Sequence, residues 1–147
     1  MIVTRNWLNE FVDFDLTPED LAHRLTMAGL EVESVETLGA GLDDVVVARL
    51  VSVDPHPDAD RLTLCEVDTG TGTVPIVCGA QNHKAGDLVA LAQVGTVLPG
   101  DFKIKKSKIR GQASMGMLCS EKELGISGEH EGIMILEGNY TAGTPFQ

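Results

Sequence analysis

From Val45 onward the chain is a succession of short runs of β-prone residues, each closed by turn residues. The run VVVARLVSV over 45–53 is rich in β-branched residues without interruption, which is typical of a strand that is covered on both faces. Shorter runs predict further strands, and short strands at close spacing with glycine-rich turns indicate a small antiparallel barrel or sandwich. These further strands are expected over 61–70, 73–78, 88–94, 103–110 and 132–138.

The first forty residues have a different pattern. Thr17 followed by Pro18 is typical of a helix N-terminus, and Leu21, Leu25 and Ala28 recur at helical spacing up to Gly29. A shorter helix is expected before it, with Trp7, Leu8 and Phe11 on one face. The run 30–38 mixes glutamates with valines and predicts a strand. The glycines of residues 39–41 then indicate a boundary between two parts of the chain.

Positive charge is concentrated in one place. The chain has 22 acidic and 11 basic residues, a net charge of −11, which argues against a general nucleic-acid binder. Residues 100–112 nevertheless hold five bases and a single acid. A local positive potential steers an anionic ligand, while the acidic remainder repels a polyanion elsewhere. The pattern therefore favours one docking orientation over indiscriminate binding.

The basic segment KIKKSKIRG, residues 103–111, does not fit a regular element. Ile104 and Ile109 are five residues apart, which places them on opposite faces of a strand and far apart around a helix. A bulge near Lys106–Ser107 resolves the conflict. Both isoleucines then point inward, and the outer face carries Lys103, Lys105, Lys108 and Arg110. The alternative is a solvated edge strand whose lysines only prevent aggregation.

Other kinds of site are poorly supported. The cysteines Cys65, Cys78 and Cys119 lack the close spacing of a structural zinc site and read as reduced, buried thiols. No glycine-rich phosphate loop and no convincing pair of nucleophile and base is present, so the chain is expected to be non-catalytic. An odd number of widely spaced cysteines indicates a cytoplasmic protein. The chain also lacks a secretory signal and any apolar run near the roughly 20 residues of a membrane span.

The stretch SMGMLCS, residues 114–120, allows two interpretations. Core packing is the default for its methionines. Alternatively, the hydroxyls of Ser114 and Ser120, with backbone amides at the start of a short helix over 119–125, contact a phosphate near Lys122. Asn82 and His83 lie on a polar turn, where they either contact a base or cap the loop.

Four motifs occur in a defined order: HPDADRL (56–62), IVCGAQN (76–82), VGTVLPGDFKIKKSKIRG (94–111) and SMGMLCSEKELG (114–125). Together they resemble the tRNA-binding OB-fold module shared by several aminoacyl-tRNA synthetases and free-standing tRNA-binding proteins. Residues 1–36 are similar to the start of bacterial phenylalanyl-tRNA synthetase β subunits. Gln81 is a departure, because many relatives have proline there.

The resemblance implies a mainly β chain in two parts. Residues 1–41 are expected to form the first half of a small α/β domain that is incomplete here, and residues 42–147 a five-stranded OB-type barrel. The tRNA-binding residues carried over from the family, with two neighbouring polar positions, are Lys103, Lys105, Lys106, Lys108, Arg110, Ser114, Met117, Ser120, Lys122 and Asn82.

The resemblance also implies a larger context. The expected partners are tRNA, a synthetase α subunit and further β-subunit domains in an α2β2 tetramer, without DNA or membrane. This chain is expected to need no cofactor, whereas the full enzyme uses ATP and magnesium to charge tRNA with phenylalanine. Two alternatives stay open. The barrel is either an assembly module with little direct tRNA contact or a free-standing tRNA-binding protein.

Overall fold

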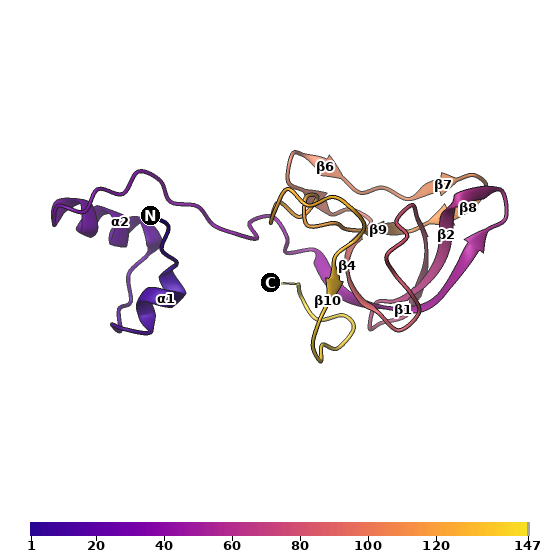
Figure 1. Ribbon diagram of the computed structural model, residues 1–147, viewed down its shortest axis with the longest axis horizontal. Coiled ribbons are helices and arrows are strands. Elements are labelled where there is room, and N and C mark those ends of the chain that lie inside the picture. The colour runs from indigo at the N-terminus through magenta and orange to yellow at the C-terminus, as the bar shows by residue number, and fades with distance from the viewer. Residues whose placement is uncertain (147) are drawn as a thin grey trace. The chain divides into compact units, whose positions relative to one another are not determined.

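The computed structural model describes residues 1–146, and the chain divides into two compact units (Figure 1). The first, Met1–Thr37, contains the helices α1 (Arg5–Asn9) and α2 (Pro18–Met27). The second begins at Leu38 and contains all the strands. Within residues 1–146, neither helix combines the length and apolar character that crossing a bilayer requires.

Local capping explains where the helices begin and end. The Thr17 hydroxyl accepts the N–H of Asp20 at 3.1 Å, and Pro18 occupies the first helical position, as predicted. Gly29 follows the helix at φ 92°, a left-handed conformation that costs glycine nothing. In α1 the Thr4 hydroxyl caps the N–H of Trp7 at 3.2 Å. Both predicted helices are confirmed.

The strand expected over 30–38 is wrong. Residues 30–37 form no helix or strand. Met1–Thr37 contains no strand with which they could pair, so the N–H and C=O groups of an extended segment would find no hydrogen-bond partners there. None of the described residues in this unit is buried: Phe11 is 73% exposed and Met27 75%. The assignment of residues 1–41 to half of a small α/β domain stays a prediction.

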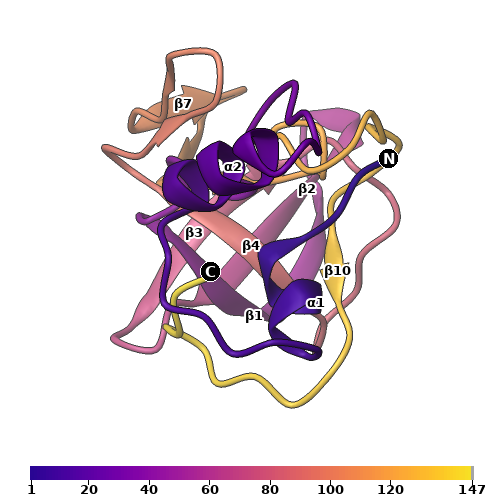
Figure 2. The same cartoon turned by 90° about the vertical axis from the view of Figure 1, so that its left-hand side faces the viewer.

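The second unit is a nearly closed antiparallel barrel (Figure 2). Five strands form its ring and a sixth, short strand extends the sheet, which confirms the predicted fold class. The main sheet has the order β10-β4-β1-β2-β3, and β9 also pairs with β4. Two further hairpins, β5–β6 and β7–β8, form separate two-stranded sheets. The strands are β1 (Val45–His56), β2 (Ala59–Asp68), β3 (Thr73–Cys78), β4 (Leu88–Gln93), β5 (Val97–Leu98), β6 (Phe102–Lys103), β7 (Ser107–Ile109), β8 (Gln112–Ser114), β9 (Gly116–Leu118) and β10 (Ile135–Leu136).

The barrel closes where β3 meets the chain between β8 and β9. Met115 donates its N–H to the carbonyl of Pro75 at 2.9 Å, and the Ser114 hydroxyl accepts the N–H of Val77 at 3.1 Å. On the other side, β9 pairs with β4 from Leu91 to Gln93. The short strand β9 and these two hydrogen bonds therefore close the barrel.

Strand β4 is buried on both faces, which explains its unbroken apolar sequence LVALA. Val89 and Leu91 belong to the barrel interior, together with residues of β1, β2, β3 and β9. Ala90 and Ala92 belong to a second cluster outside the sheet, which includes Leu98 and Ile104. The basic segment is thus anchored to the back of β4 through Ile104, which is 5% exposed.

Two expected elements near the C-terminus are smaller than predicted. Residues 121–125 form consecutive turns and no helix, because Gly125 at φ 70° and the bond from Ile126 N–H to the Glu121 carbonyl end the segment after one turn. The strand expected over 132–138 contains only Ile135–Leu136. The reason is geometric, since β9 and β10 share the edge of a β4 strand that is only six residues long.

Candidate nucleic-acid interface

A groove of about 950 Å³ opens on the barrel surface beside the basic segment. The end of β3, the chain from β6 to β7, the chain from β8 into the turn after β9, and residues 130–133 contribute to it. Its lining includes the buried apolar residues Ile104, Leu118 and Ile133 and the half-buried Met117. The result is a concave surface with an apolar lining, which suits the face of a nucleobase.

Three lysines and one glutamate are the charged side chains that line this groove. Lys103, Lys105 and Lys122 are all exposed at its rim. The carboxylate of Glu123 is occupied by Ser120, because its Oε2 accepts the backbone N–H at 2.6 Å and the hydroxyl at 2.7 Å. In a chain with a net charge of −11, the groove lining thus carries a local excess of positive charge.

The basic segment is not one kinked strand. It contains the two-residue β6, a stretch without regular structure over 104–106, and the three-residue β7. Ile104 points inward as predicted, whereas Ile109 is 36% exposed and its inward orientation was wrong. The bulge argument assumed one continuous strand, while the chain changes sheets between the two isoleucines.

Only part of the predicted face of four cations lines the groove. Lys103 and Lys105 line the groove, but Lys106, Lys108 and Arg110, although exposed, do not. Ser107 and Ile109 line it instead, and residues at alternate positions of a strand point to opposite sides. The segment therefore presents two groups of cations, one in the groove and one on and beside the outer side of β7.

Arg110 lies in a tight turn that the sequence prediction missed. It has φ 51° and Gly111 has φ 84°, while Ile109 pairs with Gln112. Two central residues with positive φ define a type I′ hairpin turn, in which asparagine and glycine are the usual pair. An arginine at the first of these positions lacks the usual sequence signal, so the hairpin was interpreted as the end of a strand.

Ser114 and Met117 have different roles. The Ser114 side chain is 1% exposed, accepts the N–H of Val77, and donates to the carbonyl of Gly116 at 3.2 Å. The bond from Val77 joins β8 to β3 and helps to close the barrel, and the bond to Gly116 fixes the chain between β8 and β9. Met117 is half-buried and lines the groove, where its side chain remains accessible.

Ser120 forms a reciprocal cap with Glu123. Its hydroxyl and N–H both donate to the Glu123 carboxylate, and the Glu123 N–H lies 3.4 Å from the hydroxyl oxygen. This is the arrangement of a capping box, here on a single turn and not on the helix that was expected over 119–125. Lys122 extends from the same turn to the groove rim.

Asn82 acts as a clamp between two loops. Its amide Nδ2 donates to the carbonyl of Ile133 at 2.8 Å, and its Oδ1 accepts the N–H of the same residue at 3.0 Å. This pairing matches the loop-capping alternative. His83 turns toward β2, with Nε2 lying 3.0 Å from the Thr63 hydroxyl and 3.5 Å from the Cys65 sulfur.

The groove also contains residues that the sequence analysis did not assign to the interface. Phe102 is 54% exposed at the groove and next to Lys103, and His130 and Ile133 come from a loop far along the chain. An exposed aromatic beside a lysine run was a usable signal for Phe102. No local signal brings residues 130–133 to this place, because the Asn82 clamp that holds them joins residues 51 apart in sequence.

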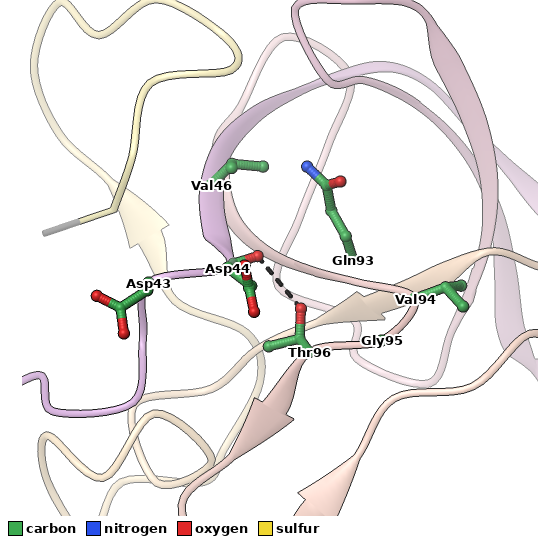
Figure 3. A pocket seen from close by; sticks show the side chains of 7 residues that line it. All are labelled: Asp43, Asp44, Val46, Gln93, Val94, Gly95 and Thr96. Carbon is green, nitrogen blue, oxygen red and sulfur yellow. Dashed lines mark hydrogen bonds between the residues drawn. The ribbon is translucent and has the colours of Figure 1, made fainter.

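A second, smaller hollow of about 360 Å³ has the opposite character (Figure 3). Asp43 and Asp44 line it, and the Thr96 hydroxyl donates to the carbonyl of Asp44 at 3.2 Å. Its lining contains no lysine or arginine. A polyanion is repelled here, which leaves the groove as the candidate interface.

The three cysteines are buried and unpaired. Among residues 1–146 no cluster of histidine, cysteine and carboxylate side chains has the arrangement of a metal site. Burial, reinforced by the Glu123 charge, raises the pKa of Cys119 to about 12. Burial also raises the pKa of Cys78 to about 11. The thiols therefore stay protonated and packed as small apolar groups.

These pKa shifts predict alkaline destabilisation. The fold favours the neutral thiol, so its contribution is complete below the ordinary thiol pKa of 9.0 and is lost as the pH rises toward 12. We expect the free energy of unfolding, measured by urea denaturation between pH 8 and 11, to fall by at most about 1.4 kcal/mol per pH unit for each such thiol. Cys119→Ala should show a shallower fall. Parallel curves for the variant and the wild type would contradict the prediction.

Three comparisons with known proteins bear on this geometry. A family model described as "Putative tRNA binding domain" matches residues 45–145. The phenylalanine–tRNA ligase β subunit of Syntrophotalea carbinolica is 70% identical over 145 residues, and that of Geobacter metallireducens is 64% identical. Each alignment covers 99% of this chain and 18% of the relative, so the chain spans less than a fifth of the length of these relatives.

A solved structure shares the fold. The C-terminal domain of Plasmodium vivax p43 has a TM-score of 0.51 and 21% sequence identity, and the match covers 73% of this chain and 61% of that one. At this identity the likeness concerns the fold alone. The barrel architecture is therefore one that an independently solved protein also adopts.

Proposed function

The chain belongs to the tRNA-binding domain family, and on that basis we propose that its barrel binds tRNA through the groove as part of a phenylalanine–tRNA ligase β subunit. The observation that carries the proposal is the gathering of Lys103, Lys105 and Lys122 around one apolar groove in a strongly acidic chain. Opposite charge on the groove and on the remaining surface restricts a polyanion to one approach.

The mode of binding follows from the groove's composition. The lysine ammonium groups suit phosphates, and the apolar lining with Phe102 at its edge suits an unpaired base. The hydroxyls of Ser114 and Ser120 and the amide of Asn82 are all engaged within the protein, so they contribute little base-specific hydrogen bonding. Recognition therefore depends on phosphate charge and RNA shape, with little sequence discrimination.

The hairpin cations extend this proposal. Lys106, Lys108 and Arg110 are exposed beside the groove and can contact phosphates of the same strand as it leaves the groove. Met117 supplies apolar contact within the groove. The proposed interface also includes residues that act indirectly, by fixing the backbone around the groove. These are Ser114, Ser120 and Asn82.

The wider context is proposed from the names of the relatives. We place the barrel within a cytoplasmic β subunit that assembles with an α subunit and further β-subunit domains into an α2β2 enzyme. ATP and Mg²⁺ would serve that whole enzyme in charging tRNA with phenylalanine. The residues of this chain would contribute to holding tRNA and would leave the chemistry to other parts of the assembly.

A second candidate function, assembly, is favoured by a different observation. Met1–Thr37 has no buried residue, and its apolar side chains Trp7, Phe11, Met27 and Val35 are between 45% and 75% exposed. Apolar area of this kind is normally covered in a working protein. We propose that other parts of the same assembly cover this unit, while the barrel keeps its groove free for RNA.

A salt titration tests the tRNA proposal. We expect tRNA to bind at low salt, and three groove lysines acting on phosphates give a log–log slope against salt of about −2 to −3. Fluorescence anisotropy with labelled tRNA at four salt concentrations measures it. A single-stranded RNA and an RNA duplex with the same number of phosphates are the matched controls. If no tRNA binding is detected at about 50 mM salt, the proposed function is refuted.

A further inference from the structure

His56 is a buried histidine at the tip of the β1–β2 hairpin, and its two ring nitrogens face different backbone partners. The side chain is 5% exposed. Nδ1 accepts the N–H of Asp58 at 3.0 Å, and Nε2 lies 3.3 Å from the carbonyl oxygen of Ile109. A backbone N–H can only donate and a carbonyl can only accept. The two bonds together therefore require the tautomer with the proton on Nε2.

Ile109 is the last residue of β7, immediately before the turn at Arg110 and Gly111. The β7–β8 hairpin has three residues in each strand and is not hydrogen-bonded into the main sheet as a strand. A two-stranded hairpin of this size is at best marginally stable by itself. It needs attachment at both ends to hold one position.

The two ends of the hairpin have separate attachments. At the open end, Ser114 and Met115 bind the backbone of β3. At the turn end, the imidazole of His56 binds Ile109 and so joins the tips of two hairpins. The contact spans 53 residues in sequence and lies next to the exposed cations Lys108 and Arg110.

The hairpin also forms one wall of the groove, through Ser107 and Ile109. Its position thus sets both the width of the groove and the direction in which its cations point. We propose that His56 is a positioning residue for tRNA, which fixes the β7–β8 hairpin in its binding orientation by donating from Nε2 to the Ile109 carbonyl. This inference rests on the proposed function and extends it to a residue that does not line the groove.

Two substitutions separate the two bonds of His56. Glutamine places its amide nitrogen near the position of Nε2, so His56→Gln keeps the donor to Ile109 and loses the acceptor for Asp58. Asparagine places its oxygen near Nδ1, so His56→Asn keeps the Asp58 turn and loses the link to the hairpin. We expect His56→Asn to weaken tRNA binding about fivefold, the effect of one hydrogen bond, and His56→Gln to stay within about twofold of the wild type.

Amide hydrogen exchange supplies the structural readout. Exchange of residues 107–114 should accelerate in His56→Asn and not in His56→Gln, while the amides of β1 and β4 stay protected in both. In the wild type, ¹⁵N shifts of the ring should show the proton on Nε2 with and without tRNA. This last measurement needs no variant, so it remains decisive should either substitution prevent folding.

The possible failures are distinguishable. If the wild type does not bind tRNA, both the proposed function and this inference fall. If the wild type binds and His56→Asn binds equally well, only the positioning role is overturned. A larger loss for His56→Gln than for His56→Asn would assign His56 to the β1–β2 turn alone, and a ring proton on Nδ1 would overturn the donor to Ile109.

Discussion

Replacing Gly116 with alanine is expected to destabilise the barrel by about 3 kcal/mol, the sum of a backbone and a packing effect. Gly116 begins β9 at φ 147°, where a side chain is strained. A Cβ there would lie 2.7 Å from the carbonyl oxygen of Ala92 and within 3.3 Å of Leu91 and Ile76 side-chain carbons. Because these neighbours belong to β4 and β3, the clash falls where the barrel closes. Urea denaturation measures the change.

Gly111→Ala is the matched control. Gly111 also has a positive φ, of 84°, but a Cβ there meets nothing within 4 Å. It should cost only the backbone part, about 1 kcal/mol. If the two variants are equally stable, the close approach of β9 to β4 and β3 does not constrain the fold as described.

The largest effect on binding is expected from Lys103→Glu combined with Lys105→Glu. Both side chains line the groove, so the double variant loses two charged contacts to phosphate. At about 1.5 kcal/mol for each contact, tRNA affinity should fall about a hundredfold. The salt slope should lose about one unit for each contact. Anisotropy titrations of the double variant against salt give both quantities.

Lys106→Glu combined with Lys108→Glu provides a control with the same change in charge. These lysines belong to the same segment and are exposed, but they do not line the groove. Their reversal should weaken binding less than that of the groove pair. An equal or greater loss would move the RNA path from the groove to the outer side of the hairpin. Thermal unfolding of both double variants should match the wild type, because exposed lysines contribute little to stability.

Much of the barrel could be predicted because its signals are local. A few neighbouring residues are enough to specify each element. Examples are the uninterrupted β-branched run of β1, the alternation that buries Cys65 and Val67 in β2, and the cap at Thr17. The strand expected over 30–38 had no such support, since a strand depends on a partner that the local sequence does not supply.

The site was less predictable because its parts come from distant segments. The groove-lining lysines could be found from charge alone. The roles of Ser114 and Asn82 could not, since their partners Val77 and Ile133 are 37 and 51 residues away. Arg110 was misplaced for another reason, as a left-handed arginine gives none of the usual signs of a tight turn.

The division of work between polar and cationic side chains has an evolutionary consequence. The hydrogen-bonding groups of Ser114, Ser120 and Asn82 bind other parts of the barrel and stabilise it. The side chains of Lys103 and Lys105 are exposed to solvent instead. Selection can therefore strengthen, weaken or redirect RNA binding by exchanging lysines without disturbing the fold. A barrel arranged in this way can be inherited by proteins with very different demands for tRNA, with its affinity reset in each lineage.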